Sequence, residues 1–129
     1  MATPTQTVIA FLDAWGAGPG GIAKAFGDYF TPETVWENIG MSKTTGPDEA
    51  MAVLAGFGES ADKVSMSVDN LAVAAIGGRV LTERVDHILD ASGKPTMSIQ
   101  VMGIFETQDG KITAWRDYFD TAGFGGEGE

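Results

Sequence analysis

The first half of the chain places apolar residues at the spacing of helices. Over residues 5–15 they recur every three or four positions, which predicts an amphipathic helix that the following glycine cluster ends. A second, shorter helix is predicted over 22–30, and a brief extended piece over 34–38. The segment 46–57 begins with a proline and two acidic residues, as the first turn of a helix often does, so a third helix is predicted there.

The second half changes to the spacing of strands. Alternating or long apolar runs cover 64–75, 79–89, 96–107 and 112–119. Asp109-Gly110 predicts a tight hairpin turn between the last two runs. No proline lies inside these runs, so the sequence allows these strands to lie in the interior of a sheet. Helices followed by antiparallel strands predict an α+β fold, with the helices on one face of a curved sheet.

Length and composition limit the functions that the chain can have. Its 129 residues suit one domain, which we expect over 1–122, followed by a flexible Gly/Glu tail over 123–129. The 18 acidic and 8 basic residues give a formal net charge of -10, so we expect no binding to nucleic acid or to anionic membranes. The absence of Cys excludes thiolate catalysis, and a single His argues against a metal site. Without a membrane-length apolar run or a secretory signal, we expect a cytoplasmic protein.

Charged residues interrupt the apolar faces of two predicted strands. Since successive side chains of a strand point to opposite faces, Arg84 and Asp86 are neighbours among aliphatic residues, and Asp117 lies between two large aromatic residues. One pocket in which Arg84 lies between both carboxylates would explain all three positions. Two carboxylates in a partly dry pocket do not easily both stay ionised, which would supply one acid and one base. The alternative is a structural ion pair in which Arg84 only neutralises half-buried acids.

Two further positions have the residue types of a functional site. Trp36 and Asn38 share a face if their segment is extended, so they could line a pocket and position a water molecule. The alternative is a core Trp beside a loop-capping Asn. His87 is a base candidate by residue type, but strand parity directs it away from Arg84 and Asp86, and we interpret it as a surface or interface residue.

Several of these residues lie in segments that resemble limonene epoxide hydrolases. The resemblance covers about residues 7–120, and its most specific parts are Arg-x-Asp at 84–86 and Trp-Arg-Asp-Tyr-Phe-Asp at 115–120. It implies a cone-shaped α+β fold of the nuclear transport factor type, which SnoaL-like polyketide cyclases share. In that fold three helices of the N-terminal half pack on the concave face of a curved mixed sheet around a deep apolar pocket, and homodimers are common. The remaining segments that carry the resemblance are Thr7-Val8-Ile9-Ala10-Phe11, Ala14-Trp15, Val35-Trp36-Glu37-Asn38-Ile39, Gly46, Gly103-Ile104-Phe105-Glu106 and Asp109-Gly110-Lys111-Ile112-Thr113-Ala114.

The resemblance also implies a reaction. A small apolar epoxide would react with water in one step to give a vicinal diol, without a cofactor, a metal or a covalent enzyme intermediate. Asp117 would be the general base that deprotonates water, and Asp86 the general acid that protonates the epoxide oxygen. Arg84 would bridge the two carboxylates, and Asn38 would hold the water.

One site position departs from the family and leaves alternatives open. Trp36 stands where the family has a Tyr whose hydroxyl helps to hold the water, and an indole N–H can donate a hydrogen bond but cannot accept one. Trp36 could therefore donate to the water, or narrow the pocket and change the substrate. Two other classes of function remain: a ketosteroid-isomerase-like or polyketide-cyclase-like enzyme, in which one Asp moves a proton next to a carbonyl, and a non-catalytic ligand-binding module.

Overall fold

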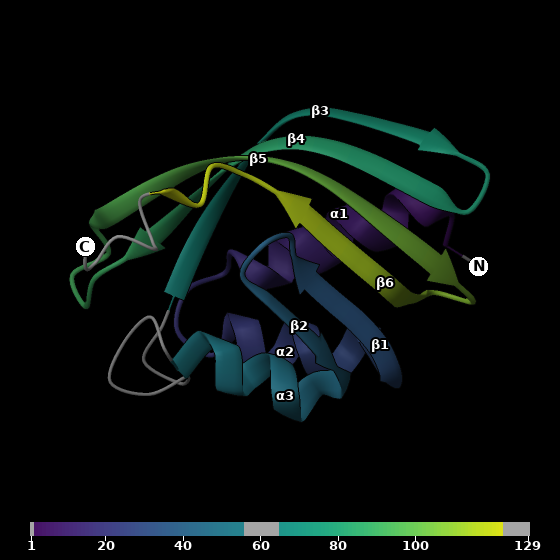
Figure 1. Cartoon of the computed structure of the whole chain (residues 1–129), viewed down its shortest axis with the longest axis horizontal. Helices are drawn as coiled ribbons and strands as arrows, with labels where there is room; N and C mark the ends of the chain where they lie inside the picture. Colours follow the sequence, from purple (N-terminus) through teal and green to yellow (C-terminus); the bar gives the residue numbers. More distant parts are fainter. Residues whose placement is uncertain (1, 56–64, 123–129) are drawn as a thin grey trace.

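The computed structural model describes residues 2–55 and 65–122. The predicted end of the third helix near residue 57 and the predicted tail over 123–129 lie outside the described residues. None of the helices in the described ranges is long and apolar enough to cross a membrane. The described elements, in chain order, are α1 (Pro4–Trp15), α2 (Gly21–Tyr29), β1 (Phe30–Asn38), β2 (Ser42–Thr45), α3 (Gly46–Leu54), β3 (Ser65–Ile76), β4 (Arg79–Leu89), β5 (Pro95–Gln108) and β6 (Lys111–Tyr118) (Figure 1).

Helix α1 begins with a capping box. The Thr3 hydroxyl accepts a hydrogen bond from the Gln6 backbone N–H, and the Gln6 side chain accepts one from the Thr3 backbone N–H. Pro4 stands at the first helical position, where its missing N–H costs nothing. The predicted periodicity is confirmed because one face of the helix is buried, comprising Thr7, Val8, Phe11, Leu12 and Trp15.

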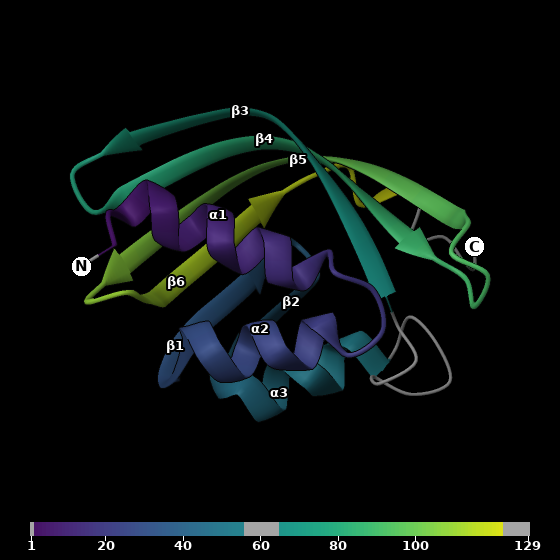
Figure 2. The same ribbon diagram turned by 180° about the vertical axis from the view of Figure 1, so that it is seen from behind.

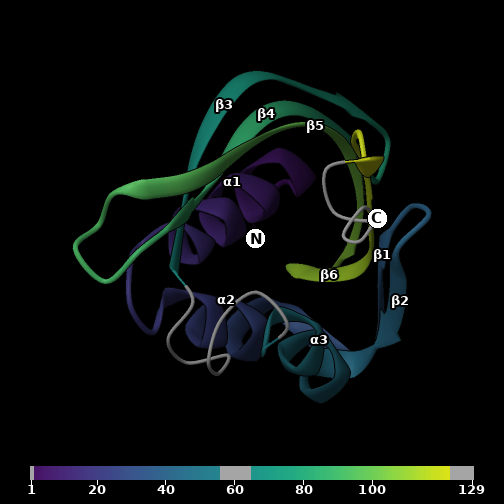
Figure 3. The same cartoon turned by 60° about the vertical axis from the view of Figure 1, so that its left-hand side comes forward.

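The sheet is curved and mixed, and it bends around α1 (Figures 2 and 3). Its strand order is β2-β1-β6-β5-β4-β3, and every pair is antiparallel except β1 with β6. The α+β prediction, with helices on the concave face, is therefore confirmed. Of the four strands predicted from proline-free runs, β4, β5 and β6 lie inside the sheet and β3 is an edge strand. Absence of proline permits an interior position without requiring one.

The extended piece predicted over 34–38 is longer in the structure and belongs to a hairpin. Strand β1 begins at Phe30, and β2 returns antiparallel to it after a short turn. The four residues of β2 were missed because a strand that short has no readable alternation.

The turn between β5 and β6 sets the pairing of the residues next to it. Asp109 and Gly110 both have positive φ, 53° and 78°, as a two-residue type I′ hairpin requires. A register shift between Glu106 and Thr107 then moves the pairing by one residue, and beyond it Gly103 lies opposite Asp117. The hairpin predicted from the Asp-Gly pair is confirmed, and the register shift beyond it determines which residues face each other further along the strands.

Aromatic rings fill the space between α1, α2 and the sheet. Trp115 on β6 lies between two rings nearly parallel to it, those of Trp36 at 4.9 Å and Phe105 at 5.1 Å between centroids. Phe11 has no exposed surface, and its ring centroid lies within 6.1 Å of those of Trp15, Tyr29, Phe30, Phe105 and Trp115. Phe11 thus attaches the first helix to the centre of the sheet.

Alanine substitutions in α1 should distinguish the contribution of Phe11 to the core from the effect of a substitution at an exposed position of the same helix. We expect Phe11→Ala to lower the free energy of unfolding by about 3–5 kcal/mol, because it opens a cavity among the packed rings. Ile9→Ala in the same helix, at a side chain that is 38 % exposed, should change it by less than about 1 kcal/mol. Urea denaturation followed by tryptophan fluorescence measures both values, and similar losses in the two variants would contradict this account of the core.

Candidate active site

Rows of residues cross the concave face of the sheet. Residues paired across adjacent strands share a face, so a row can be read from the strand registers. Two such rows lie side by side. One carries large side chains, which include Trp36, Phe105 and Trp115. The row that carries polar groups runs through Thr82 on β4, Gly103 on β5, Asp117 on β6, Asn38 on β1 and Ser42 on β2.

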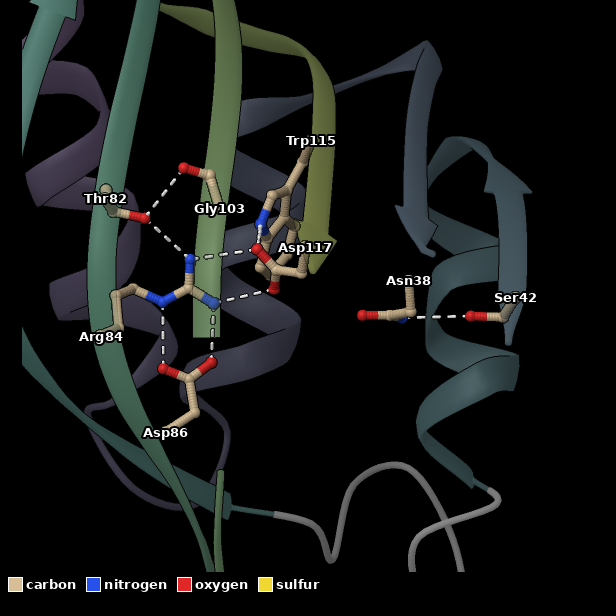
Figure 4. Close-up of polar contacts among 8 residues, drawn as sticks. All are labelled: Asn38, Ser42, Thr82, Arg84, Asp86, Gly103, Trp115 and Asp117. Atoms are coloured by element: carbon tan, nitrogen blue, oxygen red, sulfur yellow. Dashed lines mark hydrogen bonds and ion pairs between the residues drawn. The ribbon is translucent and has the colours of Figure 1, made fainter. Parts of the chain in front are cut away.

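Arg84 lies two residues beyond Thr82 on β4, and its guanidinium group joins two carboxylates (Figure 4). Nε and Nη2 donate to the two oxygens of Asp86 at 3.0 and 2.8 Å. Nη1 and Nη2 donate to the two oxygens of Asp117 at 3.1 and 2.8 Å. Nη1 also donates to Thr82 Oγ1 at 3.0 Å. These five bonds use all five N–H donors of the guanidinium.

The three charged groups are almost dry. Arg84 has no exposed surface, and Asp86 and Asp117 are 5 % and 4 % exposed. Burial alone would lower the pKa of the Arg84 guanidinium, but the charges of Asp117 and Asp86 outweigh burial and raise its pKa above the ordinary value. Arg84 is therefore a permanent cation. Its centre also lies 5.8 Å from the ring centroids of Phe105 and of Trp115, close enough for a cation–π attraction.

The two carboxylates have different surroundings. Burial raises the pKa of Asp117, and Arg84 only partly opposes this effect. Asp117 accepts a third hydrogen bond from Trp115 Nε1 at 2.7 Å, in addition to those from Arg84. Among the described residues, Asp86 accepts side-chain hydrogen bonds from Arg84 alone. Asp117 is thus the more fully hydrogen-bonded of the two carboxylates, and Asp86 has more acceptor capacity left for another partner.

Both carboxylates line a cavity of about 330 Å³. This volume is at the small end of the range for ligand pockets. Asn38, Ser42 and Trp36 also line it, and the rest of the wall is mainly apolar. The cavity therefore offers a small, mostly apolar molecule one polar corner, and its apolar wall includes Trp15, Val53, Leu54, Met66, Ile88 and Ile99.

Asn38 faces Asp117 across the paired strands β1 and β6. Its Nδ2 donates to Ser42 Oγ at 3.1 Å, and Figure 4 shows its amide oxygen on the side of Arg84 and Asp117. Asn38 is 8 % exposed. The arrangement leaves an amide acceptor and a carboxylate acceptor facing each other across the polar corner of the cavity.

Trp36 is a wall of the cavity and part of the core. Its ring is stacked on Trp115 at an interplanar angle of 16°. Its Nε1 is buried, and no described residue accepts a hydrogen bond from it. An N–H that water cannot reach in this conformation is poorly placed to hold a water molecule, so the position of Trp36 favours a role in shaping the cavity.

His87 lies on the opposite face of β4. Its ring nitrogens are 2.7 Å from Ser98 Oγ and 3.0 Å from Asp69 Oδ2. The side chain of Asp69 is 69 % exposed, so this group of residues lies at the surface, away from the cavity. The parity argument for His87 agrees with this placement.

Sequence reasoning missed three residues that contact the charged group. Thr82 and Trp115 share strand faces with Arg84 and Asp117, so the parity argument already placed them nearby and needed only to be extended by two positions. Gly103 gave a weaker signal, a glycine inside an apolar strand, which can mark a place where another group approaches the backbone closely.

Comparison with known proteins agrees with this fold. The family model described as limonene-1,2-epoxide hydrolase catalytic domain matches residues 2–124. Epoxide hydrolase EphG of Mycobacterium tuberculosis is 36 % identical over 88 residues, which are 68 % of this chain and 56 % of that protein. The chain therefore matches little more than half the length of this curated relative.

Solved structures extend the comparison. The structure of an M. tuberculosis LEH-like epoxide hydrolase has a TM-score of 0.72 at 31 % identity, covering 92 % of this chain and 83 % of that one. An NTF2-like protein of unknown function from Cytophaga hutchinsonii has a TM-score of 0.71 at 17 % identity, covering 94 % and 93 %. The second likeness shows the NTF2-like fold alone, whereas the family model covers nearly the whole chain. The chain belongs to the limonene-1,2-epoxide hydrolase family.

Proposed function

We propose that the protein is a cofactor-independent epoxide hydrolase that converts a small apolar epoxide into a vicinal diol. The observation that carries the proposal is one buried guanidinium bound to two carboxylates, Asp86 and Asp117, at the polar corner of an apolar cavity. An apolar wall suits the hydrocarbon part of the substrate, and a paired acid and base suit the opening of a strained ring.

Water is the nucleophile in the proposed reaction. A water molecule between Asn38 and Asp117 donates one hydrogen bond to each, which directs its lone pair toward the substrate. Asp117 takes a proton as the water oxygen attacks an epoxide carbon. The carbon–oxygen bond of the ring breaks, and Asp86 gives its proton to the leaving oxygen, so no alkoxide forms. One water adds to one epoxide, and a single diol results.

Arg84 keeps the charge of the site constant through this reaction. Before the reaction Asp86 is protonated and Asp117 ionised, and afterwards the proton is on Asp117. In both states one carboxylate balances the guanidinium, so the buried group of three stays neutral overall. A neutral group avoids the large cost of an unpaired charge in a dry site. Returning the proton from Asp117 to Asp86 completes the cycle.

The same geometry argues against the isomerase alternative. An isomerase of this kind needs a neutral hydrogen-bond donor for the developing oxyanion and a separate base. Here a cation binds both acids directly, and Asp86 and Asp117 are linked through it. This arrangement suits coupled acid and base action on two atoms of one substrate.

Trp36 sets the width of the cavity in this proposal, and Asn38 and Asp117 hold the water.

The homodimer and the cytoplasmic location stay predictions. Exposed Leu71, Met102 and Tyr118 line a shallow hollow on the outer face of the sheet, which supports a second copy binding there.

Asp117→Asn should abolish turnover without unfolding the protein. The amide keeps the shape of the side chain but cannot take a proton, so we expect kcat to fall by about 100-fold or more. Asp13→Asn, which makes the same charge change at an exposed position of α1, should leave kcat unchanged. Diol formation from limonene oxide, cyclohexene oxide and styrene oxide is measured by gas chromatography. Equal turnover by Asp117→Asn and the wild type would rule out Asp117 as the base.

The one-step route predicts where isotope from labelled water goes. In a single turnover in H₂¹⁸O, with enzyme in excess, the oxygen atom added to each diol molecule should be ¹⁸O from the labelled water. Mass spectrometry of peptides containing Asp86 and Asp117 should find no ¹⁸O in either carboxylate. Label in a carboxylate would instead mean that the side chain attacked the epoxide and that water released a covalent ester.

The rate should fall toward low pH. Asp117 acts ionised, and burial raises its pKa, so kcat should fall with decreasing pH at values above the ordinary Asp range of about 4. The profile is measured between about pH 4 and about pH 9, with the non-enzymatic hydrolysis subtracted and folding checked by circular dichroism. A rate that stays constant down to the lower limit would contradict the assignment.

A further inference from the structure

Gly103 lies at the centre of the polar row, between Thr82 on β4 and Asp117 on β6. Its backbone is not in the positive-φ region where glycine is favoured. Glycine inside a strand weakens it, because the position loses packing and gains freedom in the unfolded chain. The backbone conformation therefore does not explain why position 103 is a glycine. The limited space around the position does.

A Cβ atom at position 103 would meet the charged group itself. It would lie 2.5 Å from Arg84 Nη1, closer still to Asp117 Oδ1, and 3.2 Å from Thr82 Oγ1. Nη1 donates to both of those oxygens. The guanidinium thus crosses β5 over the bare Cα of Gly103, where any other residue would put a side chain (Figure 4).

Thr82 holds the same nitrogen from the other side. Its Oγ1 accepts a hydrogen bond from Arg84 Nη1 at 3.0 Å and donates one to the Gly103 carbonyl oxygen at 3.4 Å. Thr82 is 1 % exposed. Because its hydrogen is directed at the backbone carbonyl, the hydroxyl presents its lone pairs on the remaining sides, and one of them accepts from Nη1.

We propose that Gly103 and Thr82 are positioning residues that set where the Arg84 guanidinium lies relative to Asp117. Gly103 does so by leaving space, and Thr82 by a directed hydrogen bond. Neither is among the residues that line the main cavity, so neither touches the substrate. This inference rests on the proposed function for its kinetic consequences, while its geometric part does not depend on the reaction.

Gly103→Ala tests the space requirement. Arg84 and Asp117 end in side-chain atoms that can move, so the variant should fold with the pair displaced. We expect kcat to fall by about 100-fold, as for a misplacement of about 1 Å, with KM changed by less than about threefold because the apolar wall is intact. Gly27→Ala in α2, where a Cβ meets nothing within 4 Å, is the matched control and should keep both constants.

The pH profile distinguishes positioning from loss of structure. Arg84 lowers the pKa of Asp117 against the effect of burial, so displacing the guanidinium should move the acidic limb of the profile to higher pH. A Gly103→Ala enzyme that is folded and slow but has the wild-type profile would overturn the proposal, as would one with wild-type kcat.

Thr82→Val and Thr82→Ser supply a second test that does not depend on how Gly103→Ala folds. Valine keeps the shape and removes the hydroxyl, and serine restores the hydroxyl. We expect kcat of Thr82→Val to fall by about tenfold, the effect of one lost hydrogen bond of about 1.4 kcal/mol, and Thr82→Ser to recover most of the loss. Equal rates in the valine variant and the wild type would overturn the role of Thr82.

A spectroscopic measurement separates this inference from the proposed function. Trp115 Nε1 donates to Asp117 Oδ1, so its indole N–H signal in a ¹H–¹⁵N correlation spectrum should shift in Gly103→Ala and stay in place in Gly27→Ala. A wild-type protein without turnover on the epoxide panel would contradict the proposed function, and the indole shift would still decide the geometric claim. An unchanged indole signal in folded Gly103→Ala would overturn that claim.

Discussion

The site depends on one saturated cation. Arg84 has five N–H donors, and the structure gives each of them an acceptor, four on two carboxylates and one on Thr82. An unpaired charge could not be buried at this depth, and neither could two adjacent carboxylates without a cation between them. The charged group can therefore lie between the aromatic core on one side and the apolar cavity on the other only because every N–H donor of Arg84 has an acceptor.

This pairing explains how the two acids can have different roles although they share one partner. The distinction does not come from Arg84, which binds both oxygens of each carboxylate. It comes from the surroundings, since Asp117 also accepts from the Trp115 indole, which is stacked between two other rings. The core thus contributes directly to the site, because the packing that holds Trp115 also holds Asp117, the proposed base.

Strand parity was enough to predict which face carries the charged residues, because burial of one face forces a period of two. It could not predict the row across the sheet, which depends on strand order and register. β6 pairs with β1 in parallel, a long-range pairing that no local pattern reports. The proposed role of Gly103 could not be predicted for the same reason. A glycine inside a strand indicates only that space is needed, and the neighbouring strands determine which group fills that space. The buried Nε1 of Trp36 likewise depends on the packing of distant rings.

The position of β6 has a consequence for how the molecule is made. It comes last among the described strands along the chain, yet it lies in the middle of the sheet between β1 and β5. Until residues 111–118 are in place, both neighbours present unpaired edges and the aromatic core lacks Trp115, so the partly synthesised chain is prone to association. Folding must await a contact between distant parts of the chain, which favours slow, all-or-none assembly. The strand that completes the sheet also brings Asp117, so the proposed pair of acids is incomplete until the last described strand is in place.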